Sequence, residues 1–259
     1  MSFVYSRYQG TFDPPVWHDF DGTGSTRTNR GSAGSVGNLT FLSGSTLDHG
    51  DIVPGILGAI FPDGGVTLEC TAPLMNIKTG FTAMFYGVIG KVASTPTIFS
   101  YWGAPAFQWG FQSDTSGDIT YRYDNSTSGT ASHTLYQFTP AVLFFRRSVD
   151  GTVVDAFFQG VPVTFPGPFP APVSTAGGDS LRIGPLSGGG IINTAFWPEP
   201  LTDEQILQIT NELTTFTEDP DPSDEVPSGL PRFYGEYEGP VSGGTKLTFL
   251  GADLGMYDR

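Results

Sequence analysis

Aromatic residues gather in the middle of the sequence, where their spacing could serve carbohydrate binding. A flat ring stacks on the apolar face of a pyranose while nearby polar groups bind its hydroxyls. Trp102 and Trp109 flank a Gly-Ala-Pro turn, and Tyr123 is followed closely by Asn125. Aromatic residues in a sheet also form cores and cross-strand pairs, which is the structural alternative. The spacing predicts a sugar-contacting cluster of Trp102, Trp109, Tyr123 and Asn125.

Catalytic motifs are missing from the sequence. There is no GxSxG nucleophile elbow and no phosphate-binding Gly-Lys-Ser/Thr loop. Glycoside hydrolysis needs two carboxylates that flank one bond. Glu236 and Glu238 would share one face of a strand, but they lie near the C-terminus, and we interpret them as surface acids. We therefore expect no enzymatic activity and no catalytic residue.

The histidines and the cysteine do not form a metal-binding pattern. His18, His49 and His133 are far apart in the sequence, and Cys70 is the only cysteine. We expect all three histidines to lie on the surface or in loops. The lone thiol excludes an intrachain disulfide and is compatible with folding in the cytosol.

Calcium is the one cofactor that the sequence leaves open. Acidic loops of a β-sandwich can hold this hard cation through carboxylate and backbone oxygens. The alternative is that these acids stabilise local turns through their own side chains. The candidate oxygen donors are Asp19 with Asp21, Asp124 with Asn125, and Asp150 with Asp155.

Short apolar stretches separated by glycine and proline predict many strands and few helices. The chain contains 35 Gly and 21 Pro, spread between these stretches. Asp150-Gly151 and Gln159-Gly160 are typical of tight hairpin turns. We expect strands over residues 81–89, 97–102, 106–112, 118–123, 142–146, 153–158 and 181–183.

One helix is predicted near residue 202. Thr202 is the expected N-cap, and Gln205 stands at the position that completes a capping box. Leu201 and Ile206 are spaced as a hydrophobic staple. The apolar positions continue at helical intervals to Leu213, where we expect the helix to end.

The outer parts of the sequence differ from this central region. Residues 1–15 are expected to form an N-terminal arm and 16–214 the folded domain. Residues 215–231 are rich in proline and acids, which predicts a semi-rigid linker. Residues 232–259 regain aromatics but are too few for a core of their own, so we expect a C-terminal arm or small hairpin.

The composition and charge of the chain disfavour some classes of binding partner. The formal charge is 12 − 26 = −14, which disfavours nucleic acid and anionic membrane surfaces. No apolar run is long enough for a membrane helix, and the first residues do not resemble a secretion signal. The 14% aromatic content argues against general disorder.

Three stretches together resemble the concanavalin A-like and laminin G-like superfamily. The first is Val-Trp-His-Asp-Phe-Asp-Gly at 16–22. The second is the hairpin over 142–163, with its Phe-Gln-Gly turn at 158–160. The third, and most specific, combines Leu-Arg-Ile-Gly at 181–184 with Pro-Leu-Thr-Asp-Glu-Gln-Ile at 200–206.

The resemblance covers about residues 16–214 and implies a fold. That fold is an all-β, two-sheet antiparallel jelly-roll sandwich, here with one short C-terminal helix and extended terminal arms. The family includes lectins, adhesion modules and glycanases, so the fold alone does not decide the function. The Glu-x-Asp-x-x-Glu strand motif of its glycanases is missing from the sequence, which counts against hydrolysis.

Two non-enzymatic functions and one enzymatic function are compatible with these features. The first is a virion structural protein, a capsid decoration or tail component made in the host cytoplasm. It would form homo-oligomers, contact a major capsid or tail protein through its arms, and bind host-surface glycans. The second is a lectin-like carbohydrate-binding module that is not part of a particle. The third, least supported, is a polysaccharide-active enzyme.

Overall fold

The computed structural model describes the central part of the chain. The described ranges are 14–20, 26–44, 46–53, 56–62, 65–70, 80–90, 97–103, 106–113, 118–123, 127–134, 139–150, 152–165, 180–186 and 188–214. For 101–103, 106–109, 122–123, 127–134 and 164 it describes the backbone. Residues 1–13 of the predicted N-terminal arm, the linker and the C-terminal arm lie outside the described residues, so the predicted domain boundaries stay predictions.

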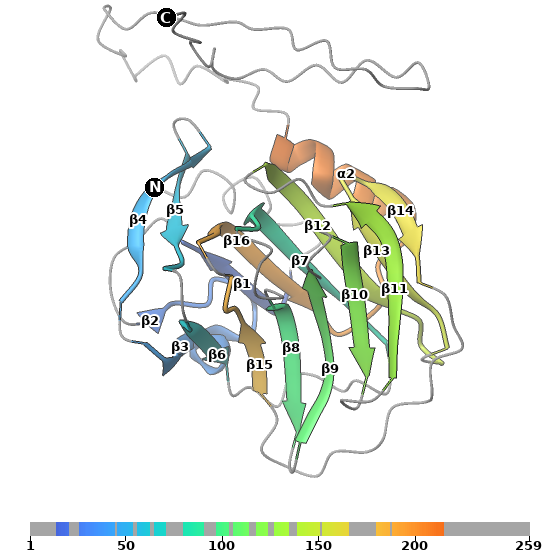
Figure 1. Cartoon of the computed structure of the whole chain (residues 1–259), viewed down its shortest axis with the longest axis horizontal. Helices are drawn as coiled ribbons and strands as arrows, with labels where there is room; N and C mark the ends of the chain where they lie inside the picture. The colour runs from blue at the N-terminus through green and yellow to red at the C-terminus, as the bar shows by residue number, and fades with distance from the viewer. Residues whose placement is uncertain are drawn as a thin grey trace, which may run out of the picture.

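The first sheet, sheet A, contains eight antiparallel strands and runs in the order β14-β13-β12-β7-β16-β5-β4, with β1 also paired to β16 (Figure 1). Its strands come from the whole folded region, because neighbours in the sheet are often far apart in sequence. The strands are β1 (Val16–Asp19), β4 (Asp48–Val53), β5 (Ile56–Ile60), β7 (Phe81–Val88), β12 (Pro140–Arg147), β13 (Val154–Phe158), β14 (Val161–Thr164) and β16 (Gly190–Trp197).

The second sheet, sheet B, also has eight strands, in the order β11-β10-β9-β8-β15-β6-β3-β2. All of its pairs are antiparallel. Its strands are β2 (Thr26–Arg27), β3 (Leu39–Ser43), β6 (Thr67–Cys70), β8 (Thr97–Gly103), β9 (Ala106–Ser113), β10 (Asp118–Tyr123), β11 (Thr127–Thr134) and β15 (Ser180–Ile183). A short 3-10 helix, η1 (Gly34–Gly37), precedes β3.

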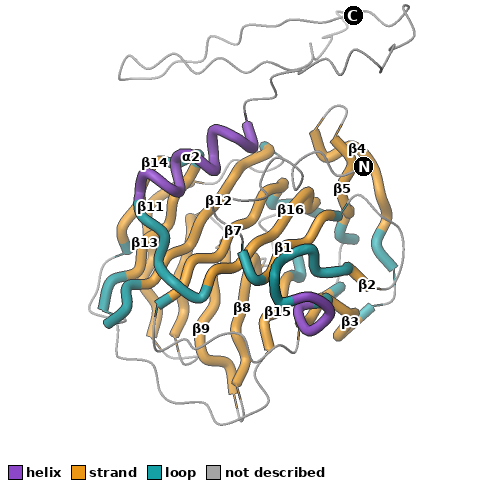
Figure 2. Tube along the Cα trace, turned by 180° about the vertical axis from the view of Figure 1, so that it is seen from behind, coloured by secondary structure: helices purple, strands orange, loops and turns teal. Residues whose placement is uncertain are grey.

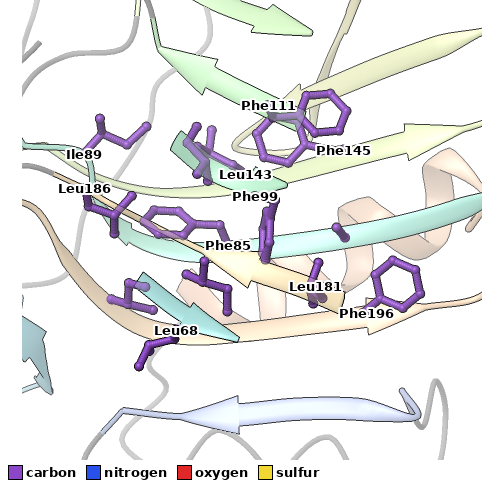
Figure 3. Close-up of a cluster of buried hydrophobic side chains, with 14 of the residues drawn as sticks. Leu68, Phe85, Ile89, Phe99, Phe111, Leu143, Phe145, Leu181, Leu186 and Phe196 are labelled. Carbon is purple, nitrogen blue, oxygen red and sulfur yellow. The ribbon is translucent and has the colours of Figure 1, made fainter. Parts of the chain in front are cut away.

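The main core lies between the two sheets and is dominated by phenylalanine. Figure 3 shows rings and aliphatic side chains from both sheets meeting there. Phe111 of sheet B stacks on Phe145 of sheet A with ring centroids 4.0 Å apart. Phe99 meets the same Phe145 ring edge-on at 6.2 Å. These contacts confirm the sandwich predicted from the sequence.

A second apolar cluster lies on the outer face of sheet A. It joins side chains of β7, β12 and β16, among them Met84, Phe144 and Trp197, to the buried face of helix α2 (Asp203–Thr214). Both views place α2 along the β12–β14 side of sheet A (Figure 1, Figure 2). Sheet A is therefore buried on both faces, which explains why every residue of β7 and of β16 is buried.

The start of α2 has the predicted capping box. The Thr202 backbone N–H donates to Gln205 Oε1 at 2.7 Å, and the Gln205 N–H donates to Thr202 Oγ1 at 3.2 Å. Asp203 and Glu204 occupy the first turn, where the helix dipole favours acids. Leu201 and Ile206 are both buried in the second cluster. The helix ends at Thr214, one residue beyond the prediction.

Arg146 of β12 fastens the helix to the sheet. One terminal nitrogen donates to Leu201 O at 2.9 Å and to Asp203 Oδ1 at 2.6 Å. The other donates to Asp155 Oδ2 at 3.0 Å. The guanidinium also lies over the Phe157 ring, 4.7 Å from its centroid. A single side chain thus connects β12, β13 and the first turn of α2.

The predicted strands and hairpins are present. All seven strand predictions match, to within two residues at each end, the elements β7, β8, β9, β10, β12, β13 and β15. Gln159 and Gly160 both have positive φ, 51° and 78°, and join β13 to β14 in a two-residue turn. Pro162 follows in β14, which is the edge strand of sheet A.

Candidate ligand-binding face

The outer face of sheet B carries polar side chains that alternate with core residues. On β15, Leu181 and Ile183 are buried in the core while Arg182 between them is half-buried on the other face. On β6, Glu69 lies in the same way between Leu68 and Cys70. This two-residue period places the polar set away from the core.

Strand register lines these polar residues up in a row across the sheet. The backbone partners run in sequence from Thr26 to Thr40, Glu69, Arg182, Ser100, Gly110, Arg122 and Ser128, from β2 at one edge to β11 at the other. A second row beside it pairs Thr97 with Gln112, Thr120 and Thr130. We call the part of this face on β6, β15, β8, β9 and β10 the open face.

An ion pair marks one side of the open face. Arg182 and Glu69 are direct register partners, and Arg182 Nη2 lies 3.5 Å from Glu69 Oε1. Their side chains are 23% and 15% exposed, so water reaches both. The pair offers donors and carboxylate acceptors next to each other, which suits a ligand rich in hydroxyl groups.

Small residues occupy the middle of the row. Ser100 and Gly110 lie between the backbone positions of Arg182 and Arg122. Adjacent strands are about 4.8 Å apart, so the three steps from β15 to β10 span roughly 14 Å. Ser100 and Gly110 are themselves buried, and the half-buried polar side chains on either side of them are Glu69, Arg182, Thr97, Gln112 and Thr120. In the second row, the Gln112 amide donates to Thr97 Oγ1 at 3.2 Å.

No described helix or strand packs over the open face. Helix α2 lies on sheet A instead, away from β8 and β15 in both views (Figure 1, Figure 2). The two sheets thus differ: sheet A has an apolar outer face under α2, and sheet B has a polar outer face.

The predicted aromatic residues lie on β8, β9 and β10 of sheet B. Trp102 is the register partner of Ser180 on β15, two residues from the Arg182–Ser100 pair. Trp109 pairs with Tyr101 on β8 and with Tyr123 on β10. The backbone of Trp102, Trp109 and Tyr123 is therefore on three adjacent strands. Their side chains, and Asn125 entirely, lie outside the described residues, so the aromatic site stays a prediction.

The carboxylates described on this face do not form a glycosidase pair. Glu69 is on β6 and Asp118 is on β10, four strand steps apart. That separation is roughly 19 Å at about 4.8 Å per step, whereas retaining and inverting glycosidases place their carboxyl groups about 5–9.5 Å apart. These two acids therefore cannot flank one glycosidic bond.

The described calcium candidates are engaged with protein groups. Asp19 pairs with Arg30 Nε at 2.9 Å and accepts from Trp17 Nε1 and Asn193 Nδ2. Asp155 pairs with Arg146. Among the described residues, no group of three His, Cys, Asp or Glu could hold a metal ion. Asp21, Asp124 and Asn125 lie outside the described part of the chain.

Asp150 stabilises its own turn. Its carboxylate accepts from the Ser148 hydroxyl and from the Thr152 backbone N–H. These hydrogen bonds lower the pKa of Asp150 to about 2. The turn interpretation of this acid, which the sequence left as the alternative to calcium binding, accounts for its contacts.

The prediction of three surface or loop histidines is wrong for His18. This residue lies in β1 and is fully buried. Its Nε2 lies 2.7 Å from the Gly37 carbonyl oxygen, so Nε2 carries the donated proton. Burial lowers the pKa of His18 to about 4, partly offset by this hydrogen bond. The alternation of β1 placed it inward beside Val16 and Phe20.

Arg182, Glu69 and Gln112 were not singled out from the sequence. Each is a lone polar residue in a short apolar stretch, for example Arg182 in Leu-Arg-Ile. That alternation is a signal for the outer face of a half-buried strand. Their assembly into one row depends on the pairing of strands that are distant in sequence, which no local pattern encodes.

The fold is similar to known β-sandwich structures. Trypanosoma rangeli sialidase in complex with sialic acid superimposes with a TM-score of 0.56 at 11% identity, over 76% of this chain and 32% of the sialidase chain. The botulinum neurotoxin type G receptor binding domain superimposes with a TM-score of 0.59 at 10% identity, over 78% of this chain and 52% of that one. At such identities the likeness concerns the fold alone.

The sequence comparisons do not assign the chain to a family. No protein-family model matches the chain, and no curated protein matches it in sequence. The chain spans about a third of the sialidase and about half of the toxin domain. No helix in the described residues is long and apolar enough to cross a membrane.

Proposed function

We propose that this protein is a non-enzymatic carbohydrate-binding module whose ligand lies on the open face of sheet B. The observation that carries the proposal is the group of half-buried polar side chains on this face, Glu69, Arg182, Thr97, Gln112 and Thr120. The fold agrees with it, since it is similar to a sialidase crystallised with sialic acid and to a toxin receptor-binding domain.

The chemistry of the face favours neutral, hydroxyl-rich ligands. Arg182, Glu69 and Gln112 supply guanidinium, carboxylate and amide groups on strands, where each side chain is already held in place. Such preorganisation lowers the entropy lost on binding. The chain carries a formal charge of −14, which repels polyanionic glycans.

A binding role without catalysis is supported by the arrangement of acids. Glu69 is held by Arg182, and Asp118 is four strands away. We therefore propose binding and release of an intact glycan. Incubation of the protein with each bound glycan, followed by mass spectrometry of the sugar, tests this: a shortened glycan would contradict it.

The test of the binding face compares one bulky substitution at two places. A neutral-glycan array identifies a ligand, and calorimetry measures its affinity for Thr120→Trp, which covers the open face, and Gln208→Trp, on the exposed side of α2. We expect at least a tenfold loss for Thr120→Trp and for Arg182→Ala, and no change for Gln208→Trp. Equal affinity in all variants would place the ligand elsewhere.

The same binding experiment also tests the predicted aromatic cluster with separate variants. Replacing Trp102, Trp109 and Tyr123 together by Ala is expected to abolish binding, and Asn125→Ala to weaken it. If the triple variant binds normally while Arg182→Ala does not, the polar row is the site and the aromatic prediction is wrong.

We also propose that the module works within a virion, as a capsid decoration or tail component that presents its glycan-binding face to the host. The supporting features are the aromatic, low-lysine sequence and the two arms predicted at 1–15 and 232–259. Density-gradient fractionation of the native source, with this chain followed by mass spectrometry, tests the role. Recovery only in the soluble fraction would exclude it.

A further inference from the structure

The two sheets end in short or weakly attached strands on the same side of the sandwich. β2 is the end strand of sheet B and β4 is the end strand of sheet A. Both views show them on the side away from β13 (Figure 1, Figure 2). β2 joins β3 through two register pairs, and the hairpin of β4 and β5 joins β16 through two more. Little backbone pairing therefore holds this edge of the sandwich.

One side-chain hydrogen bond connects the two end strands. Arg27 of β2 and His49 of β4 approach each other with Arg27 Nη2 2.9 Å from His49 Nε2. Both side chains point into the space between the sheets, because their register partners Leu39 and Ala59 belong to the main core. The pair therefore links sheet A to sheet B at their common edge.

Arg27 is held in place and is the donor of this hydrogen bond. The residue is 4% exposed, and its guanidinium lies over the Phe20 ring, 5.8 Å from the centroid. A guanidinium stays charged at any pH at which a protein is folded, and it has donors but no acceptor. Arg27 must therefore donate to His49 at every pH.

The hydrogen bond requires a neutral His49. Because Arg27 donates, Nε2 of His49 accepts with its lone pair, so the ring proton is on Nδ1. Protonation of the ring adds a proton to Nε2, which removes the acceptor and places two positive charges at hydrogen-bond distance. Histidine is the side chain that ordinarily changes its charge between pH 5 and 8. Acid therefore breaks this contact.

The other charged groups around His49 belong to its own strand. Asp51 shares the face of His49 on β4, whereas Asp48 is on the opposite face. Within the described part of the chain, Arg27 is the charged side chain that β2 presents to His49. The positions of β3 and β5 that pair with Arg27, His49 and Asp51 are uncharged, namely Leu39, Ala59 and Leu57.

We propose that Arg27 and His49 form a pH-sensitive clasp, which closes this edge of the sandwich at neutral pH and opens it in acid. Once the clasp opens, β2 and the β4–β5 hairpin are held by their short pairings to β3 and β16. They then move apart, and solvent reaches core residues beside the clasp, such as Phe20 and Ala59, which are fully buried when it is closed. The edge is the two-state element, and a proton on His49 biases it.

Amide hydrogen exchange of the full chain at pH 7.5 and pH 5 tests the clasp. Protection is corrected for the intrinsic exchange rate at each pH and compared between the native chain and His49→Gln. The Gln carbonyl oxygen can accept from Arg27 but does not titrate, so the clasp stays closed in this variant. We expect protection in β4 and β5 to fall about tenfold more in the native chain than in His49→Gln, the size expected for the loss of one hydrogen bond to a charged group.

This comparison separates the clasp from the other buried histidine. His18 is present in both proteins, so the stability that its burial costs in acid is lost equally in both. Strands β12 and β13, on the far side of sheet A, serve as the internal reference. An equal fall in β4 and β5 for the two proteins, or an extra fall in the native chain that is as large in β12 and β13, would overturn the proposal.

The ring of His49 gives a second measurement that needs no variant. NMR of the imidazole nitrogens at pH 7.5 is expected to show a proton on Nδ1 and an accepting Nε2. On acidification the doubly protonated ring should appear together with shifts of the amide signals of β2 and β5. A proton on Nε2 at pH 7.5, or protonation of the ring without any change in β2 and β5, would contradict the clasp.

Discussion

The two outer faces of this sandwich differ in what covers them. The outer face of sheet A is apolar and lies under α2, where Met84, Phe144 and Trp197 meet Ile206 and Ile209. The outer face of sheet B carries the row from Glu69 through Arg182 to Ser100.

A strand that is buried on both faces has a nearly continuous apolar sequence, whereas a strand with one polar face alternates. β7 reads Phe-Thr-Ala-Met-Phe-Tyr-Gly-Val and is buried throughout, whereas β15 reads Ser-Leu-Arg-Ile and alternates around its half-buried arginine. We therefore expect substitutions on the outer face of sheet B to destabilise the fold less than substitutions under α2.

The largest effect expected from this comparison is at the helix. Ile209→Ala removes a fully buried side chain between α2 and sheet A, so we expect a loss of about 3–4 kcal/mol in the free energy of unfolding. Thr120→Ala, on the open face, should cost less than about 1 kcal/mol. Urea unfolding of both variants measures the difference, and equal losses would refute the contrast between the faces.

A second expected effect is a loss of folding stability at acid pH, caused by the buried His18 in β1. The pKa of His18 falls from 6.5 in the unfolded chain to about 4 in the fold. Above pH 6.5 both states are neutral. Between pH 6.5 and 4 only the unfolded state takes up a proton, so stability decreases as the pH falls, and below pH 4 this contribution levels off.

The size of that loss follows from the shift. A difference of 6.5 − 4 = 2.5 units corresponds to roughly 3 kcal/mol at about 1.4 kcal/mol per unit. NMR titration of the His18 ring checks the value directly. A midpoint near 6.5 in the folded protein would show that burial does not control this histidine.

A third effect compares the two arginine sites. Arg146→Ala removes three hydrogen bonds that hold α2 to β12 and β13, and we expect a loss of about 2 kcal/mol. Arg182→Ala breaks a longer, water-accessible pair on the open face and should cost about 1 kcal/mol or less. Chemical denaturation of both proteins ranks them; the reverse order would mean that the open face stabilises the fold.

The smallest effect concerns the first turn of the helix. Thr202→Ala removes the side-chain cap on the Gln205 N–H and should cost about 1 kcal/mol. Because Gln205 returns a hydrogen bond to Thr202, the losses from Thr202→Ala and Gln205→Ala should not add. A double-mutant cycle followed by thermal unfolding measures this coupling. If the two losses in unfolding free energy simply add, then the two hydrogen bonds of the capping box do not reinforce each other.

Local elements of the fold could be predicted from the sequence. The capping box at Thr202, the turn at Gln159-Gly160 and strands such as β10 depend on residues close together in the chain. Their physical causes act over a few residues, so the pattern and the structure agree.

The assembly of the site could not be predicted in the same way. Arg182 meets Glu69 across 113 residues, and only the strand order brings them together. His18 was misjudged for a related reason, because its partners Gly37 and Thr194 come from the 3-10 helix η1 and from the distant strand β16. Alternation in the sequence shows that successive residues of a strand point to opposite faces of the sheet. It does not show which of the two faces another part of the chain will bury.

The proline in strand β14 affects how these molecules can meet. Pro162 lies at the rim of sheet A and pairs in register with Phe157. Proline has no backbone N–H, so it cannot donate to a strand added along this rim. Sheet A therefore resists lateral growth into a fibril from this side, and ordered contact between copies is directed toward the other edges of the sandwich.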